Sequence, residues 1–494
     1  MPKQKMTLAE AIVERLAGLG VKRMFGVPGG GSSLDLIDAA ATVGIDFVLT
    51  RGETSAALMA AVTGELTGTP GVALTGIGPG AASAVNGVAY ASLERAPMLL
   101  FTDGRAIAPD KSPHQVFDQP ALFRPITKDS GALRPDDGRG RFDEMIAATL
   151  SSPMGPAQID LSSADSAMPV ADFAASQAAA TDQEKPSEQA MSAALAMIGK
   201  ARRPVIVAGL EARDTAAAVG LTRLAHALGC AVLTSYKAKG AFPDSDPQCV
   251  GHFTGAEAER PCLADADLII FYGLDPIEAV PGKWGYAAPL LALRRAAIAP
   301  GPIIGGAQTE VIGDLAMIAE RLADAAVGSS WQPAEINGHR ETMAARLRLG
   351  GVSGEATVET VVEALGEAAP AGCRLTVDAG AHMFSTMARW RAERPFGVLK
   401  SNGLSSMGFA LPAAIASALE MPERPVAAVT GDGGMMMCLA ELSTAARLGL
   451  RLVVVVINDA ALSLIDIKQQ GQQRPSLGVR YPRVDFAAAA EAMG

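Results

Sequence analysis

The chain has 494 residues, 49% of them hydrophobic, and a formal net charge of −10. This length is enough for three domains of ordinary size, and the negative charge argues against nucleic acid or an anionic membrane as a partner. No apolar run approaches the roughly 20 residues of a membrane-spanning helix. Five scattered cysteines without a C-x-x-C pair predict reduced thiols in a cytoplasmic protein, with neither a disulfide frame nor a zinc site.

The N-terminal third alternates short apolar runs with alanine-rich helical stretches. A helix is predicted from Thr7 to Leu19, because Thr7 and Glu10 have the spacing of a capping box. Strands are predicted at the apolar runs 23–27, 46–49, 71–74 and 98–101. Because alternating strands and helices indicate βαβ units in a parallel sheet, residues 1–170 are predicted to form a first α/β domain.

The same alternation occurs twice more along the chain. Residues 171–187 have the composition of a linker, and residues 188–327 are predicted to form a central domain with strands at 204–208, 230–233 and 267–272. The polar, glycine-containing stretch 328–354 is expected to be a second boundary. A third domain is predicted over residues 355–494, with strands near 375–377, 425–429 and 452–457. The predicted fold class is therefore α/β, with three consecutive doubly wound parallel-sheet domains.

Two aspartates follow very apolar runs in the third domain. Asp432 lies in Gly431-Asp432-Gly433-Gly434, and Asp459 follows the run that ends at Ile457. Parallel sheets bind ligands at the carboxyl ends of their strands, so both loops can open into one crevice. Glycines allow backbone N–H groups to approach a phosphate, and carboxylates with phosphate oxygens suit Mg²⁺ or Ca²⁺. The pattern predicts a divalent cation held against a diphosphate.

The Gly-Asp-Gly motif followed by Asn458-Asp459 resembles the signature of thiamine-diphosphate-dependent enzymes, in particular the group of acetolactate synthase, benzoylformate decarboxylase and pyruvate decarboxylase. The resemblance covers almost the whole chain and is closest in pattern to acetolactate synthases. It implies pyrimidine-binding, central and diphosphate-binding domains in this order. Relatives generally continue beyond the position of Gly494, so we expect the third domain to be incomplete at its C-terminal end. No adjacent His-His pair occurs, which argues against close kinship with pyruvate decarboxylase.

The resemblance implies a set of cofactor-binding residues. For the metal it implies Asp432, Asp459 and the backbone carbonyl of Ala461, which would complete an octahedron with two diphosphate oxygens and a water. Many relatives have asparagine where this chain has Asp459. For the cofactor itself the implied residues, in addition to both aspartates, are Pro28, Gly29, Gly78, Ala381, His382, Met407, Gly431, Gly433, Gly434, Leu462, Ser463 and Leu464.

Three of these residues have alternative interpretations. In the family's pattern, Met407 would wedge the cofactor into a bent shape, which brings reacting atoms together; methionines also commonly fill cores. His382 would donate a hydrogen bond to a phosphate, although a lone histidine is as often structural. Leu464, together with Ile465, would line the substrate pocket at the start of a predicted helix.

Two residues are implied as catalytic. Glu53 follows a predicted strand and matches the family's glutamate that bonds N1′ of the aminopyrimidine ring, which makes the cofactor's 4′-amino nitrogen basic enough to deprotonate the thiazolium C2. Its alternative is a solvated glutamate at a helix start. Gln115 precedes the block 123–128, which looks very like acetolactate synthases, and its family counterpart faces the substrate-derived intermediate. An exposed loop glutamine is the alternative there.

The predicted function is a thiamine-diphosphate- and Mg²⁺-dependent decarboxylase or carboligase acting on a small 2-oxo acid, acetolactate-synthase-like, with a simple decarboxylase or C–C lyase as the alternative. A nicotinamide-dependent dehydrogenase is more remote: Gly76 to Ala81 fits a loose G-x-G-x-x-A pattern, but no acidic residue follows at a strand end. A non-catalytic paralogue is equally remote. FAD is possible in the central domain but not favoured. The family implies a homodimer or homotetramer with the site at the subunit interface.

Overall fold

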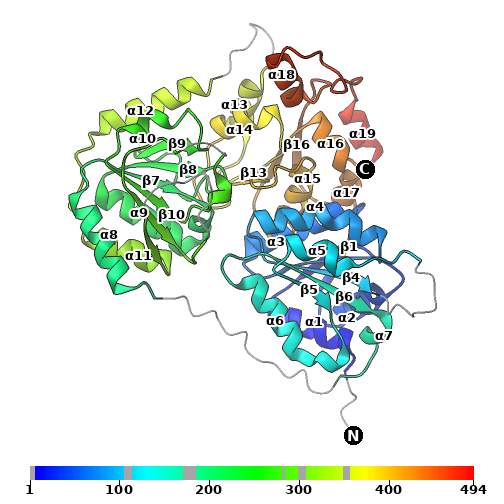
Figure 1. Cartoon of the computed structure of the whole chain (residues 1–494). Helices are drawn as coiled ribbons and strands as arrows, with labels where there is room; N and C mark the ends of the chain where they lie inside the picture. Colours follow the sequence, from blue (N-terminus) through cyan, green and yellow to red (C-terminus); the bar gives the residue numbers. More distant parts are fainter. Residues whose placement is uncertain (1–5, 105–113, 171–184, 281–283, 299–307, 349–355) are drawn as a thin grey trace.

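The computed structural model describes residues 6–104, 114–170, 185–280, 284–298, 308–348 and 356–494. It contains three sheets, each purely parallel and each surrounded by helices (Figure 1). This confirms the predicted fold class of three successive α/β units. Part of the expected linker, residues 171–184, lies outside the described residues.

The first sheet has the strand order β2-β1-β3-β4-β6-β5. The capping box of Thr7 and Glu10 is formed at the start of α1, as predicted. Strand β4 is buried between β3 and β6, which explains its continuous apolar run. The elements are α1 (Leu8–Gly18), β1 (Arg23–Val27), α2 (Ser32–Thr42), β2 (Asp46–Leu49), α3 (Glu53–Thr67), β3 (Gly71–Thr75), α4 (Pro79–Leu93), β4 (Met98–Gly104), α5 (Gln119–Phe123), η1 (Arg124–Ile126), β5 (Asp129–Ala132), η2 (Pro135–Asp137), α6 (Gly138–Leu150), β6 (Pro156–Ser162) and α7 (Ser163–Ser166).

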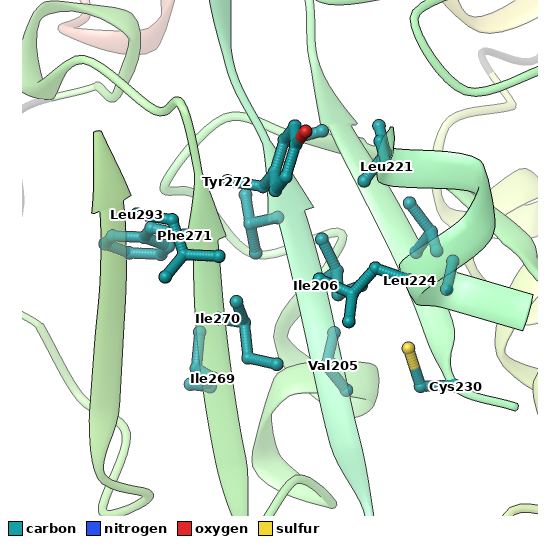
Figure 2. Packing of buried hydrophobic residues seen from close by; sticks show 14 of the residues in the cluster. Val205, Ile206, Leu221, Leu224, Cys230, Ile269, Ile270, Phe271, Tyr272 and Leu293 are labelled. Carbon is teal, nitrogen blue, oxygen red and sulfur yellow. The ribbon is translucent and has the colours of Figure 1, made fainter. Parts of the chain in front are cut away.

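The central sheet has the order β12-β11-β10-β7-β8-β9. Ile206 and Ile270 are register partners on neighbouring strands, and they belong to the same core cluster as Leu221 and Leu224 of α9 (Figure 2). The elements are α8 (Glu188–Lys200), β7 (Pro204–Ala208), η3 (Leu210–Arg213), α9 (Thr215–Leu228), β8 (Ala231–Ser235), β9 (Cys249–Phe253), α10 (Arg260–Ala264), β10 (Leu268–Tyr272), η4 (Pro276–Glu278), β11 (Leu290–Arg294), β12 (Gln308–Ile312), α11 (Leu315–Asp324) and α12 (Pro333–Arg346).

The third sheet has the order β14-β13-β15-β16. Its elements are α13 (Val358–Ala368), β13 (Arg374–Val377), α14 (Ala381–Arg389), β14 (Val398–Lys400), α15 (Ala410–Glu420), β15 (Val426–Gly431), α16 (Asp432–Cys438), α17 (Glu441–Arg447), β16 (Leu452–Ile457), α18 (Ser463–Gly471) and α19 (Phe486–Ala492). Strand β16 is the edge strand of this sheet, and Val453 is 54% exposed.

Every strand expected from an apolar run is present, with ends that shift by a residue or more at some of them. The sequence did not predict β5, β6, β9, β11, β12 and β14, which are short or carry polar residues. The stretch that we expected to be a second boundary contains helix α12, which packs against β9 of the central sheet. Its partly apolar face, with Ile336 and Met343 buried, explains this position.

The first and third domains pack directly on each other. Helix α3 of the first domain lies against α4 of its own domain and α15 of the third (Figure 1). The buried face of α3 is rich in small alanine side chains, which allow close helix packing. In the described residues, no helix is long and apolar enough to span a membrane. All five cysteines are free, and four of them are buried.

Candidate active site

All of the predicted site residues except Gln115 lie just beyond the carboxyl ends of strands or open the helices that follow them, in two domains. In the first domain, Pro28, Glu53 and Gly78 follow β1, β2 and β3. In the third domain, His382, Met407, Asp432 and Asp459 follow β13, β14, β15 and β16 in the same way. Since parallel sheets bind ligands at this edge, each domain offers one candidate binding surface.

The first-domain surface is built from glycine loops in close contact. A Cβ atom added at Gly29 would lie 2.7 Å from the Cα of Gly76, so the loops after β1 and β3 touch. A Cβ at Gly78, whose φ is +64°, would lie 2.0 Å from the carbonyl oxygen of Gln115. These positions require glycine because no side chain fits between the loops.

Glu53 is the first residue of α3 and is half-buried beside this surface. A Cβ at Gly80 would lie 3.2 Å from Glu53 Oε1. Among the described residues, the carboxylate of Glu53 makes no hydrogen bond or ion pair. The carboxyl group is therefore held by its helix and by packing, and its oxygens remain able to bind a ligand.

The side chain of Gln115 is exposed, and its φ of +61° places it in the left-handed region. Gln119, which the sequence analysis missed, is buried instead. Its Oε1 accepts the Gly78 N–H at 2.7 Å, and its Nε2 donates to Asp160 Oδ1 at 2.8 Å. Gln119 thus fixes the loop after β3, and no sequence motif marks it.

Asp103 is a second residue that the sequence analysis missed. This buried carboxylate at the end of β4 accepts hydrogen bonds from the N–H groups of Gly31 and Ser33 and from both hydroxyls of Ser32 and Ser33. It holds the loop that contains Pro28 and Gly29. Its position at a strand end, in the run Phe101-Thr102-Asp103-Gly104, was the available signal.

The third-domain surface brings Asp432 and the loop of Asp459 together. Asp432 is 3% exposed, and its Oδ2 accepts the N–H of Ala460 at 2.7 Å. Its Oδ1 accepts the N–H of Gly433 at 2.7 Å and the hydroxyl of Tyr481 at 2.8 Å. Asp459 is exposed and its carboxylate accepts a hydrogen bond from the Ser463 hydroxyl. The two carboxylates expected to bind the metal therefore lie on adjoining loops.

Several of the predicted cofactor-binding residues lie close to Gly433. A Cβ there would lie 2.8 Å from Leu462 Cδ2, 3.1 Å from Tyr481 Oη and 3.2 Å from Met407 Cε. Gly431 and Gly434 flank it, and a Cβ at Gly434 would lie 2.3 Å from Asp378 Oδ2. The structure places Met407 beside the Gly-Asp-Gly turn. Ala381 and Leu464 open α14 and α18 near this surface, each partly buried.

His382 has an unpaired polar atom at this surface. The side chain is 6% exposed, its ring lies against Gly380 and Gly431, and its buried Nε2 has no hydrogen-bond partner. Burial lowers the pKa of His382 to about 4, with Asp459 and Asp432 opposing that shift. A neutral imidazole has one N–H donor, and with that hydrogen on Nε2 it could donate one hydrogen bond to an anionic group such as a phosphate.

Asp378 is a buried residue that connects the loop after Met407 to strand β15 at this surface. Its carboxylate accepts hydrogen bonds from the N–H groups of Gly408 and Phe409 and from the Thr430 hydroxyl. Burial raises the pKa of Asp378 to about 6, while these donors act in the opposite direction. The residue was visible in the sequence as the start of the segment that leads to His382, but its supporting role was not predicted.

In the described residues, no group of three or more His, Cys, Asp or Glu could hold a metal ion alone. Asp432, Asp459 and the Ala461 carbonyl would need further oxygen ligands, which a diphosphate supplies. The buried free nitrogen of His382 and the glycine turn fit such a group. The donor set is therefore suited to a cation bound together with a diphosphate.

Comparisons with known proteins identify the class of protein that this fold and site define. Family models of thiamine pyrophosphate enzymes match residues 6–122 (N-terminal TPP binding domain), 191–291 (central domain) and 378–494 (C-terminal TPP binding domain). The chain belongs to the thiamine pyrophosphate enzyme family.

Several curated relatives align over nearly the whole chain. An acetolactate synthase of Bacillus subtilis is 29% identical over 507 residues, covering 98% of this chain and 87% of the relative. An acetolactate synthase of Mycobacterium bovis is 30% identical over 518 residues, covering 99% of this chain and 83% of the relative. A probable 2-ketoarginine decarboxylase of Pseudomonas aeruginosa is 28% identical over 503 residues, covering 100% of this chain and 89% of the relative. These similarities support a thiamine-diphosphate-dependent, acetolactate-synthase-like protein.

Proposed function

We propose that the protein is a thiamine-diphosphate- and Mg²⁺-dependent enzyme that decarboxylates a small 2-oxo acid and transfers the remaining fragment to a second carbonyl compound. The third-domain surface is the observation that carries this proposal: two carboxylates on adjoining loops, a glycine turn and the unpaired Nε2 of buried His382. When bound, thiamine diphosphate supplies a nucleophilic carbon and an electron sink for decarboxylation.

The residues of this chain would bind and orient that cofactor. Asp432, Asp459 and the Ala461 carbonyl would hold Mg²⁺, and His382 would donate a hydrogen bond to a diphosphate oxygen. Met407 lies against Gly433 in a position to fix the shape of the cofactor between its two rings. Glu53 would bind the ring nitrogen N1′ and exchange a proton there. Gln115 would contact the substrate at the entrance.

The site would form between two copies of the chain. Glu53 belongs to the first domain and the metal ligands belong to the third, and each surface alone offers only part of the chemistry. We propose a homodimer or homotetramer, in which the first domain of one subunit faces the third domain of another. The partners would be small molecules of the cytoplasm, without nucleic acid or membrane.

A simple 2-oxo acid decarboxylase is the second candidate, because the relative named as a probable 2-ketoarginine decarboxylase aligns as completely as the synthases. The dehydrogenase interpretation of Gly76 to Ala81 is disfavoured by the geometry of that loop. The Gly78 N–H, which a pyrophosphate would need, is already bonded to Gln119, and the carbonyl of Gln115 closes on Gly78.

The experiment that tests the proposal is a screen of 2-oxo acids with and without thiamine diphosphate and Mg²⁺. Release of CO₂ together with a hydroxyketone product that requires both additions is the expected result. Release of an aldehyde alone would favour the decarboxylase. If calorimetry shows no binding of thiamine diphosphate in the presence of Mg²⁺, the proposed function is wrong.

A further inference from the structure

The three domains meet at a buried cluster of charged groups outside the candidate active site. Glu65 and Glu94 come from the first domain and Arg213 and Lys237 from the central domain. The side chains of Glu65, Glu94 and Lys237 are each 1% exposed, and that of Arg213 is 7% exposed. Buried charges are costly unless they are paired, so this cluster must be paired closely to persist.

Lys237 lies at the centre of the cluster. Its Nζ is 2.9 Å from Glu65 Oε2 and 3.0 Å from Glu94 Oε2. Glu65 also pairs with Arg213 at 2.6 Å and accepts a hydrogen bond from the Tyr90 hydroxyl. Glu65 therefore keeps a strong partner without Lys237. For Glu94, Lys237 provides the one salt bridge among the described residues, and the buried ammonium of Lys400 adds a weaker attraction.

The cluster continues directly into the segment that carries Met407. Glu94 Oε1 accepts the N–H of Asn402 at 2.5 Å and the N–H of Gly403 at 2.8 Å. Lys237 Nζ also donates to the backbone carbonyl of Lys400 at 3.3 Å. The start of segment 400–408 is thus attached to the first domain through one oxygen of Glu94 and to the central domain through Lys237.

The rest of this segment is fixed in the same manner. The Ser406 hydroxyl donates to Asn86 of the first domain at 2.9 Å, and Gly408 N donates to Asp378 at 3.0 Å. Ser405 has a φ of +53°, which an L-residue adopts only when its surroundings require it. Met407 is therefore positioned by contacts at both ends of its segment. Two of these contacts come from the central domain: the Lys237 ammonium, and the Glu278 carbonyl, which accepts a hydrogen bond from Asn402 Nδ2 at 3.4 Å.

We propose that Lys237 and Glu94 are positioning residues, through which the central domain holds the segment 400–408 and thereby the placement of Met407 against the Gly-Asp-Gly turn. The effect on the shape of the cofactor rests on the proposed function. The contacts that fix segment 400–408 are present without cofactor. It gives the central domain a role in the site that needs no ligand of its own.

Two substitutions test the ion pair between Glu94 Oε2 and Lys237 separately from the hydrogen bonds that Glu94 Oε1 accepts. Glu94→Gln keeps an oxygen that can accept from Asn402 and Gly403, but it turns an amide group toward the Lys237 ammonium. Lys237→Met removes the cation that forms the salt bridge with Glu94. In the double variant both groups are neutral and the backbone acceptor remains. We expect segment 400–408 to become more mobile in each single variant. In the double variant we expect its order to return.

The first measurement is amide hydrogen exchange of residues 400–408 in the cofactor-free protein. The exchange rates of the Asn402 and Gly403 amides should rise at least about tenfold in both single variants. In the double variant these rates should be close to those of the unmodified protein. The matched control is Glu393→Gln, which changes another contact between the central and third domains, that of Ser245 with Glu393. Exchange in segment 400–408 should be unchanged in this control.

The second measurement is the rate at which thiazolium C2 of bound thiamine diphosphate exchanges its proton for deuterium. The single variants should slow this exchange several-fold while the double variant recovers it, because the bent shape of the cofactor depends on Met407. Unchanged amide exchange in both single variants would overturn the inference, as would accelerated amide exchange with normal C2 exchange. If the protein binds no thiamine diphosphate, only the proposed function fails, and the amide-exchange result stands.

If Lys237→Met does not fold, Lys237→Arg and Glu94→Asp replace it. Lys237→Arg keeps the charge and should preserve protection of the segment. Glu94→Asp keeps the ion pair within reach but withdraws the acceptor from Asn402 and Gly403, so it should release the segment. Equal exchange in these two variants would contradict the proposed role of Glu94.

Discussion

The first and third domains share a strand order but use it differently. The order β2-β1-β3-β4 of the first sheet corresponds to β14-β13-β15-β16 of the third, so equivalent loops follow equivalent strands. In the first domain the loop polar groups bond to one another, as Asp103 and Gln119 show. In the third domain, His382 Nε2 has no partner and Asp459 is exposed.

This difference indicates a division of labour. A surface whose polar groups are satisfied internally keeps a fixed shape and suits a largely uncharged ring, with Glu53 as its one reactive group. A surface with an unpaired imidazole nitrogen and two carboxylates suits a charged ligand and its cation. The same topology therefore provides two complementary halves, and the predictions below test each half.

The largest effect is expected for Glu53→Gln. The amide keeps the size of the side chain but cannot exchange a proton with N1′, so turnover should fall by about 10² to 10⁴-fold. Binding of thiamine diphosphate, measured by calorimetry, should change little because the diphosphate contacts lie in the third domain. Normal turnover in this variant would remove the proton-transfer role from Glu53.

The third-domain half is tested by Asp432→Asn, with Asp459→Asn as its matched control. Loss of the buried negative charge at Asp432 should weaken Mg²⁺ binding by about two orders of magnitude, measured in the presence of thiamine diphosphate. Asp459 is exposed, and asparagine can still provide an oxygen, so Asp459→Asn should have a much smaller effect. Equal effects of both substitutions would contradict the arrangement in which Asp432 is the principal ligand.

A smaller effect is expected for Tyr481→Phe. The Tyr481 hydroxyl donates to Asp432 Oδ1, and its segment is held by hydrogen bonds between Tyr481 N and the Ala460 carbonyl and between Leu462 N and the Val479 carbonyl. Removal of a hydrogen bond that orients a metal ligand typically costs 10- to 100-fold in metal affinity, and we expect about tenfold here. Unaltered Mg²⁺ affinity would show that Asp432 is oriented without Tyr481.

The last prediction concerns the stability of the central domain and its dependence on pH, with no effect expected on the cofactor site. Burial raises the pKa of Glu278 from its ordinary value to about 8, although the Ser235 hydroxyl and the N–H groups of Leu210 and Asp275 oppose the shift. A raised folded-state pKa means that stability is fully present below about pH 4.5 and is lost as the pH rises toward 8. Thermal unfolding should show this decline, and Glu278→Gln should flatten it. If thermal stability falls with pH equally in the unmodified protein and in Glu278→Gln, Glu278 is not the cause of the decline.

The sequence predicted the fold class because buried parallel strands are apolar along their whole length, as β7 and β10 illustrate. It did not predict β5 or β14, whose short runs contain Asp129, Ser130 or Lys400. Their pairing depends on neighbours that lie far away in the sequence, and propensity alone does not define it.

The candidate site was predictable where chemistry requires a compact motif. Asp432, Asp459 and the glycine turn lie where the pattern placed them, and Met407 lies beside them. Tyr481 could not be predicted, because its contact with Asp432 depends on how the chain returns after α18. Gln119 and Glu94 were not identified because the groups that they hold in the site loops are backbone N–H groups, which leave no pattern in the sequence.

Mixing two inactive variants tests the central claim most directly. Glu53→Gln and Asp432→Asn are purified separately, mixed under conditions that exchange subunits, and assayed for turnover of the 2-oxo acid found in the screen. Native mass spectrometry confirms the mixed oligomers. If each site combines the first domain of one subunit with the third domain of another, some sites regain both residues and turnover returns. Mixed oligomers that stay inactive would contradict the account.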